Sequence, residues 1–539
     1  MALQHAQVTV VVIGYDDAAH VADAVRSALA QGPAVREVIA VDDCSSDGSV
    51  ALLEGLAAVE PRLKVIRRPV NSGGCGTPRN DGLNAATSPY VMFLDSDDVL
   101  EPDAAEVLLA AARRHDADVA SGTCLRVELP EGRTSVWAPQ LYDVAAGAKL
   151  PGTVLDGIGG HPEMLWDTLV VNKLYRRDFL TRTGLRFPSG LLYEDFVFTG
   201  RLYAARPRIA VIGAPVYRWH VRRDAASLSV SLHRSVVQNW QDRVTAHGMV
   251  VSDLTEAGLT RLAEEAQAKF LDYDLPMYLR ELPQRSASYR AAWWQITRAH
   301  LAGFPGAAVE RARPVSRWLA AAVTRLPEVP VGPELGRLVE LSAVPPRLVP
   351  PYQGDAQAPA LELGGESVPL SGLTGLPADR LPIAVEGTVT VGSTVRVTVL
   401  VRELYGRLAA LGPRTVRLEL AERGGLRPPI TAEGELRKVP GGWAAHVSFA
   451  ARDLSAAGRL TSWSVHARVG YADGLATVTE VRAGAGQRTR RDAVLLRPGR
   501  VLLVQTHVTP RRALLFRGAS GMDGVRRAVG SARRRLTSR

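Results

Sequence analysis

The sequence predicts an α/β fold with an N-terminal parallel-sheet domain, then a helical region, then a C-terminal β-sandwich. Between residues 8 and 125, short β-branched runs alternate with stretches of helical spacing, which is typical of a parallel sheet covered by helices. Apolar residues keep helical spacing from 234 to about 326. Beyond the Pro pairs between 345 and 351, β-branched segments separated by Gly and Pro turns indicate a sandwich.

The N-terminal domain opens with residues 8–13, a continuous apolar run expected of a strand buried on both faces. Further strands are predicted at residues 38–41, 63–66, 90–94 and 118–120. Helices are predicted between them at residues 21–29, 49–56, 78–86 and 101–112. Because ligands of such sheets bind at the carboxyl ends of the strands, polar residues that follow these strands are the candidates for a functional site.

The remaining chain divides at changes of pattern and at proline-rich breaks. We predict an α/β domain at 1–232, a helical linker domain at 233–350, a β-sandwich domain at 351–510 and a basic tail at 511–539. The sandwich strands are expected at residues 389–391, 395–401, 416–420, 445–449 and 465–469. Two roles stay open for the sandwich, namely acceptor binding and the assembly of homo-oligomers.

The positive charge of the chain is concentrated at its C-terminal end. The formal net charge is +10, and residues 511–539 contain nine Arg and one Asp. The other residues are therefore nearly neutral, which disfavours a nucleic-acid-binding protein. Within the tail the cations are mixed with Leu514, Leu515 and Phe516. This mixture favours an anchor on an anionic membrane surface, and a solvated basic end is the alternative.

The apolar and cysteine patterns predict a cytoplasmic protein. The longest clean apolar run, residues 8–13, is far shorter than the ~20 residues that cross a bilayer, and no cleavage-site pattern follows it. Three Cys without metal-binding spacing are typical of reduced thiols. If the tail binds lipid, the protein is expected to be peripheral at the inner face of the cell membrane.

Acidic residues follow three of the predicted strands, within the segments 14–17, 42–43 and 95–98. A lone Asp at such a position is usually a turn former or helix cap, but clustered carboxylates repel one another unless a cation or donor satisfies them. Asp95-Ser96-Asp97 offers hard oxygen ligands, which suit Mn²⁺ or Mg²⁺ with substrate phosphates as remaining ligands. The sequence therefore predicts a Mn²⁺ or Mg²⁺ site at this edge.

The motifs together resemble those of family 2 glycosyltransferases with the GT-A fold, a Rossmann-like fold that binds nucleotide-diphosphate sugars. Two other phosphate-binding motifs do not fit: no G-x-x-x-x-G-K-[ST] occurs, and the Gly-rich segment 73–76 does not follow the first strand. The resemblance covers residues 7–230. The matching segments are residues 10–15, 37–49, 71–74, 78–82, 93–98, 172–179, 193–196 and 217–220.

The resemblance implies a nucleotide-diphosphate-sugar donor and assigns its contacts by motif position. Tyr15 and Asp43 would hold the base, with Asp43 accepting the pyrimidine N–H. Arg79 would lie near the nucleotide, while Asp95 and Ser96 would lie at the ribose or the sugar. The implied nucleotide is a uridine diphosphate.

Transfer with inversion needs a base for the acceptor proton and a cation for the leaving diphosphate. The resemblance places Asp97 on the metal and His220 as a further metal or diphosphate contact, a packed interior histidine being the alternative. Asp195 matches the position of the family's base, and its neighbour Glu194 is the rival for that role. Lys173, with the Arg pair at 176–177, would face phosphates unless these residues are solvated surface charges.

The preferred interpretation is a metal-dependent inverting glycosyltransferase that acts on a hydroxyl of a bacterial surface glycopolymer, such as teichoic acid or capsule. The order of the domains resembles that of transferases that decorate wall teichoic acid. A carbohydrate-binding or assembly protein with a degenerate transferase domain is the main alternative, and a nucleotidyltransferase is a third. The intact acidic residues favour an enzyme whose partners are the donor and the glycopolymer acceptor.

Overall fold

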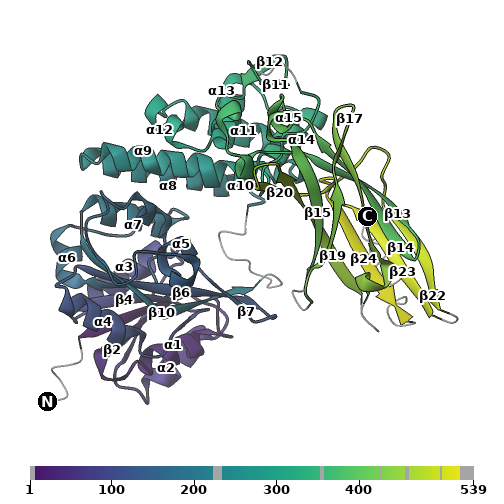
Figure 1. The fold of residues 1–539 in the computed structure, drawn as a ribbon. Helices are drawn as coiled ribbons and strands as arrows, with labels where there is room; N and C mark the ends of the chain where they lie inside the picture. The colour runs from purple at the N-terminus through teal and green to yellow at the C-terminus, as the bar shows by residue number, and fades with distance from the viewer. Residues whose placement is uncertain are drawn as a thin grey trace. The chain divides into compact units, whose positions relative to one another are not determined.

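The computed structural model describes residues 7–222, 234–352, 357–423, 427–455, 460–497 and 500–521. It confirms the predicted fold class, with a mixed α/β sheet first, then helices, then largely antiparallel sheets (Figure 1). The chain forms two compact units. Unit 1 comprises Met1–Phe270 and Ala287–Arg311, and unit 2 comprises Leu271–Ser286 and Ala312–Arg539. The predicted linker domain at 233–350 is thus divided, because its helices belong partly to each unit.

Unit 1 is built on a ten-stranded sheet with the order β3-β2-β1-β4-β9-β6-β10-β5, in which β7 pairs with β6 and β8 with β10. The strands are β1 (Val8–Gly14), β2 (Val35–Asp42), β3 (Leu63–Arg67), β4 (Tyr90–Asp95), β5 (Val99–Leu100), β6 (Val119–Leu129), β7 (Arg133–Val136), β8 (Val154–Asp156), β9 (Lys173–Arg176) and β10 (Arg208–Arg222). As predicted, β1 is parallel to β2 and β4. The sheet is not wholly parallel, because β9 runs antiparallel to β4 and β6.

Helices cover the two faces of this sheet (Figure 1). They are α1 (Val21–Leu29), α2 (Ser49–Ala57), α3 (Gly76–Ala85), α4 (Ala104–Arg114), α5 (Pro139–Tyr142), α6 (Arg177–Arg182) and α7 (Glu194–Ala204). A Cβ at Gly82 would lie 2.2 Å from a methyl of Val11, so glycine lets α3 approach β1 closely. This close approach brings Arg79 of α3 to the carboxyl ends of the strands.

Four helices of the predicted linker complete unit 1: α8 (Val237–Glu256), α9 (Thr260–Lys269), α11 (Ala287–Leu301) and α12 (Gly306–Arg311). Helix α8 packs directly on α7. At their crossing, a Cβ on Gly200 would come within 2.6 Å of Val250, so only glycine allows this spacing. Trp240 of α8 is fully buried and stacks on Trp293 of α11, which gives this helical layer a core of its own.

Unit 2 joins short helices to two packed sheets. The helices are α10 (Leu275–Leu279), α13 (Pro314–Arg325), α14 (Gly332–Leu341) and α15 (Arg407–Leu411), and a small hairpin is formed by β11 (Ala360–Leu363) and β12 (Glu366–Pro369). One sheet has the order β17-β18-β14-β13-β21, and the other has the order β16-β15-β19-β24-β23-β22 with β20 on β19. Phe449 and Phe516 meet across the two sheets with ring centroids 5.6 Å apart, which supports the predicted sandwich packing.

The strands of the two sheets differ in burial: β14 and β19 alternate buried with more exposed residues, as expected when one face of a sheet is covered, whereas β24 is buried along nearly its whole length. They are β13 (Val385–Val391), β14 (Thr394–Arg402), β15 (Pro413–Glu422), β16 (Ile430–Glu435), β17 (Arg437–Val439), β18 (Gly442–Ala450), β19 (Thr461–Tyr471), β20 (Ala476–Glu480), β21 (Arg482–Ala483), β22 (Arg490–Arg497), β23 (Arg500–Val508) and β24 (Leu514–Ser520).

The boundary of the basic tail at 511 is wrong. Leu514, Leu515 and Phe516 lie in β24, between β19 and β23, and are at most 2% exposed. They are sandwich core and are not available for contact with lipid. The rest of the predicted tail, residues 522–539, lies outside the described residues. Among the residues that are described, every helix is too short or too polar to span a membrane.

Candidate active site

The predicted acidic strand ends meet at one edge of the sheet of unit 1. The backbone N–H of Asp43 donates to the carbonyl of Gly14 at 2.9 Å, which ties the ends of β2 and β1 together. Ser96, just after β4, donates its hydroxyl to Asp17 after β1 at 2.7 Å. Tyr15 is 52% exposed beside them. The three acidic turns therefore lie together at one edge of the sheet, as predicted, with the exposed ring of Tyr15 beside them.

Asp43 is nearly buried and its carboxylate is held in place. It accepts hydrogen bonds from the backbone N–H and the hydroxyl of Ser72 and pairs with Arg68 Nε at 2.7 Å. The next residue, Cys44, has a φ of 70°, in the left-handed region that Gly and Asn adopt most readily. Each carboxylate oxygen has two lone pairs, so Asp43 keeps acceptor capacity for a ligand N–H.

Arg79 is the buried cation of the site. Its Nη2 lies 2.7 Å from Asp95 Oδ1 and its Nη1 lies 2.6 Å from Glu194 Oε1, while its guanidinium covers the ring of Phe187. Burial opposes the charge, but the carboxylates of Asp95 and Glu194 raise the pKa of Arg79 well above its usual value. Arg79 thus joins the end of β4 to the start of α7.

The start of α7 carries the two candidates for a base. Burial and the charge of Asp195 raise the pKa of Glu194 to about 7, against the opposing charge of Arg79. Burial also raises the pKa of Asp195, whose Oδ1 accepts the N–H of Phe196 at 2.7 Å. Within the described residues the other oxygen of Asp195 makes no hydrogen bond. Asp195 is therefore better placed than Glu194 to accept a proton.

The acidic turn after β4 is fixed from the other side by β10. Asp98 is buried and accepts the hydroxyl of Tyr217 and the backbone N–H of His220, both at 2.7 Å. Burial, with the charge of Asp97, raises the pKa of Asp98 well above its usual value. Sequence reasoning did not select Asp98, although it completes the acidic run, or Tyr217, although it opens the motif that ends at His220.

Asp97 and His220 are adjacent, as a shared ligand would require. His220 Nδ1 lies 3.1 Å from the carbonyl of Asp97, and a donating Nδ1 leaves Nε2 as the basic nitrogen. The Asp97 side chain is 47% exposed and lies 3.2 Å from Arg222 Nη1. Partial burial and the charge of Asp95 raise the pKa of Asp97 to about 6. No sequence signal pointed to Arg222 beyond its closeness to His220.

The donor set fits a Mn²⁺ or Mg²⁺ ion only with help from a substrate. The described residues contain no group of three or more His, Cys, Asp or Glu side chains arranged around one metal position. Asp97 and His220 would supply two ligands. Such ions are commonly held by one or two protein groups together with substrate phosphates and water, so the pair fits a metal that arrives with a diphosphate.

Comparisons with known proteins identify this domain. Residues 9–160 match the family model of glycosyl transferase family 2. The N-terminal domain is a family 2 glycosyltransferase domain. By sequence, the chain is 29% identical over 306 residues to the succinoglycan biosynthesis protein ExoO of Rhizobium meliloti, covering 55% of this chain and 79% of ExoO. It is 26% identical to the poly(ribitol-phosphate) β-glucosyltransferase of Bacillus spizizenii, covering 50% of this chain and 40% of that protein.

The fold beyond the glycosyltransferase domain also has a known counterpart. The crystal structure of Staphylococcus aureus TarS aligns with a TM-score of 0.54 and 16% identity, over 95% of this chain and 84% of TarS. Residues 1–349 of TarS in complex with UDP-GlcNAc align with a TM-score of 0.52 and 18% identity, over 67% of this chain and 98% of that one. These likenesses show a shared fold.

The predicted role of Lys173 at a phosphate is wrong. Lys173 is 1% exposed at the start of β9, in the interior of the glycosyltransferase domain, and its Nζ lies 2.7 Å from Asp167 Oδ2. It also donates to Asn172 Oδ1 at 3.0 Å and to the carbonyl of Leu169. Burial lowers the pKa of Lys173. Because the side chain is enclosed by protein groups, it does not face donor or acceptor phosphates.

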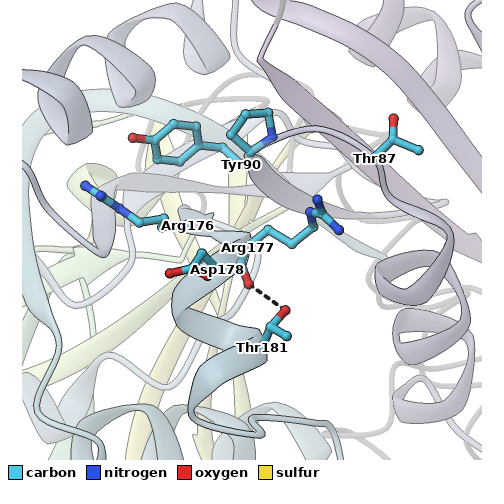
Figure 2. Close-up of a pocket in the computed structure, with 7 residues that line it drawn as sticks. Thr87, Tyr90, Arg176, Arg177, Asp178 and Thr181 are labelled. Carbon is cyan, nitrogen blue, oxygen red and sulfur yellow. Dashed lines mark hydrogen bonds between the residues drawn. The ribbon is translucent and has the colours of Figure 1, made fainter.

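The Arg pair that follows Lys173 lies at the other edge of the glycosyltransferase domain. Arg176 and Arg177 line a cavity of about 510 Å³ with Thr87, Tyr90 and Thr181 (Figure 2). Tyr90 begins β4 whereas Asp95 ends it, so this cavity and the acidic site lie at opposite ends of that strand. Arg176 pairs with Asp116 at 2.6 Å. These cations therefore do not join the acidic site.

Proposed function

We propose that the chain is a metal-dependent inverting glycosyltransferase that moves a sugar from a UDP-linked donor to a hydroxyl of a bacterial surface glycopolymer. One observation carries the proposal: Arg79 gathers Asp95 of β4 and Glu194 of α7 at one edge. That contact brings the acidic turn, which suits a diphosphate and its metal, next to Asp195, which suits a base. A degenerate, non-catalytic domain would have no need for both.

The donor roles follow from exposure and hydrogen-bonding capacity. The half-exposed ring of Tyr15 offers a face on which a base can stack, and Asp43 accepts the base N–H. Asp95 and Ser96 contact the ribose or the sugar. Asp97 and His220 hold the Mn²⁺ or Mg²⁺ ion. When bound, the ion supplies positive charge that stabilises the leaving diphosphate.

Asp195 acts on the acceptor. As the acceptor hydroxyl oxygen bonds to the anomeric carbon, its proton passes to the free carboxylate oxygen of Asp195, and the bond from that carbon to the diphosphate breaks. Attack on the face opposite the leaving group inverts the anomeric centre. The raised pKa of Asp195 brings it nearer the working pH, where a general base is most effective.

The relatives support the substrate class. TarS was crystallised with UDP-GlcNAc, the Bacillus spizizenii relative is named for transfer to poly(ribitol-phosphate), and ExoO is named for succinoglycan biosynthesis. Two of these names thus refer to a polymer, poly(ribitol-phosphate) or succinoglycan. A polyol-phosphate or polysaccharide acceptor is therefore the one to test first.

The test is hydrolysis of UDP-sugars with Mn²⁺ and with EDTA, which requires no acceptor. We expect slow wild-type hydrolysis that EDTA abolishes, and Asp97→Ala should behave in Mn²⁺ as the wild type does in EDTA. Asp195→Asn should keep donor affinity and lose ~10²–10⁴-fold in turnover. Asp178→Asn, at the opposite edge of the sheet, is the matched control. Metal-independent activity, or a fully active Asp97→Ala, would overturn the proposal.

A further inference from the structure

Two residues on one face of helix α8 contact the start of α7. Asn239 and Arg243 are four residues apart, so they share one face of α8. Tyr193, which precedes α7, donates its hydroxyl to Asn239 Oδ1 at 2.8 Å. The Arg243 guanidinium lies 4.8 Å from the ring centroid of Tyr193 and 4.7 Å from that of Phe196. Arg243 therefore bridges the aromatic residues on both sides of the Glu194–Asp195 pair.

The backbone at this point needs such support. Tyr193 has a φ of 69°, in the left-handed region that a bulky residue rarely adopts. Such a conformation is unfavourable and persists only where surrounding contacts impose it. The hydrogen bond to Asn239 and the cation over the ring are contacts of that kind. Because Phe196 donates its N–H to Asp195 Oδ1, fixing both rings also fixes the Asp195 carboxylate.

Arg243 also acts on Asp195 through its charge. Burial raises the pKa of Asp195, whereas the positive charges of Arg79 and Arg243 lower it. Other ionisable groups among the described residues also interact electrostatically with Asp195, including Cys75 before α3, Asp95 on β4, Lys173 and Tyr175 on β9, and Glu194 on α7. Arg243 is the residue of α8 whose charge acts on Asp195.

We propose that Arg243, with Asn239, is a positioning residue that holds Asp195 in place, so that helix α8 is part of the catalytic machinery. The inference rests on the proposed function, in which Asp195 is the base. Helix α8 lies beyond residue 160, where the family match ends. A domain that ended at residue 232 would therefore lack Asn239 and Arg243.

The experiment compares Arg243→Met and Arg243→Lys with Arg201→Met in the full chain. Arg201 of α7 pairs with Asp253 of α8 at 3.1 Å, so its loss weakens the same helix contact away from Asp195. We expect Arg243→Met to lower the turnover of transfer by ~10–100-fold, the scale of a displaced catalytic group. Its donor Kd should stay within ~3-fold of the wild type, because the proposed function assigns no donor contact to Arg243. Arg201→Met should lower Tm alone.

The pH profile separates positioning from general stability. Without the positive charge the pKa of Asp195 rises, so the acidic limb of kcat should move to higher pH by up to ~1 unit in Arg243→Met. Arg243→Lys keeps the charge and should leave the limb near its wild-type position. Equal effects of Arg201→Met and Arg243→Met, or an unchanged turnover and limb in Arg243→Met, would overturn the inference.

Two further variants keep the test decisive. If Arg243→Met does not fold, Tyr193→Phe removes only the hydroxyl that bonds Asn239 and should still lower turnover by ~3–10-fold at unchanged donor Kd. Full turnover in Tyr193→Phe would then count against the inference. Asp195→Asn separates the two proposals: if it is active, the proposed function fails, whereas an inactive Asp195→Asn with a normal Arg243→Met defeats only the role of α8.

Discussion

Two buried cations in unit 1 bind carboxylates, and they differ in what surrounds those carboxylates. The partner of Arg79 at the end of β4, Asp95, has a side chain that is 33% exposed, whereas the partner of Lys173, Asp167, is fully buried. The first pair lies where strands end, and the second lies in the protein interior at the start of β9. A pair at an open edge can exchange contacts with a substrate, but an enclosed pair cannot. Both pairs join a buried cation to a carboxylate. What distinguishes the pair in the candidate active site from the pair in the core is that a substrate can reach it.

The largest effect on turnover is expected from Arg79→Met. The variant leaves Asp95 and Glu194 without their shared cation, so the end of β4 and the start of α7 lose their common anchor. We expect transfer to fall by ~10³-fold. Stability should fall by only about 1–3 kcal/mol, because Asp95 can be hydrated and Glu194 can be protonated. Steady-state kinetics and thermal unfolding of one preparation measure both effects.

Lys173→Met should show the reverse pattern. Asp167 has no access to water, so loss of its cation leaves a buried charge, at a cost of about 3–5 kcal/mol. The turnover of the protein that remains folded should stay within ~3-fold of the wild type, because Lys173 touches no substrate. The double variant Lys173→Met/Asp167→Leu should recover most of the lost stability, since an apolar pair can replace a buried ion pair. A large loss of turnover at a normal Tm would instead indicate that Lys173 takes part in the active site.

The same contrast shows which features the sequence could predict. Asp43, Asp95 and Asp97 follow strands whose order is visible in the pattern, and the carboxyl ends of parallel strands must meet at one edge. Lys173 opens a four-residue strand, and nothing local indicates that this strand enters the sheet antiparallel between β4 and β6. Its burial is a property of the tertiary structure alone.

Long-range contacts account for the other differences. Leu514–Phe516 stand among cations in the sequence, and only pairing with β19 and β23 reveals a core strand. Arg243 lies in a helix that the sequence pattern presents as a linker, and its relation to Asp195 depends on how α8 packs on α7. Periodicity predicts helices and strands well, but it does not indicate which helix face meets which loop.

Glu37 is another enclosed carboxylate, and it provides a pH-dependent comparison. Glu37 of β2 is nearly buried and receives hydrogen bonds from Lys64, Thr87 and Thr9. Burial opposes its ionisation, but these bonds outweigh burial and lower the pKa of Glu37 to about 2. Since the pKa in the folded state lies below the unfolded value, the stability that Glu37 contributes is present above the unfolded pKa and is lost as pH falls toward 2.

Glu37→Gln should therefore lower the stability of unit 1 by about 2–4 kcal/mol at pH 7. The gap in Tm between variant and wild type should narrow as pH falls from about 4.5 toward 2, because Glu37 takes up a proton in the unfolded chain before it does so in the folded one. Scanning calorimetry across this range measures it. Turnover at neutral pH should hardly change, because Glu37 lies on the sheet away from the acidic turn. A gap that is constant with pH would mean that the carboxylate charge is not the source of the stability.

The smallest effect on catalysis is expected from the C-terminal residues, and the boundary of β24 decides how to test them. Deletion from 511 would remove a core strand, so the informative deletion is 522–539, which keeps β24 and removes six Arg and one Asp. Each cation near an anionic surface contributes about 1 kcal/mol at low salt. We expect unchanged UDP-sugar hydrolysis and Tm, with loss of flotation on phosphatidylserine vesicles. Equal flotation of both forms would assign membrane binding to another surface, and no flotation of the full chain would leave the Arg run as a solvated end.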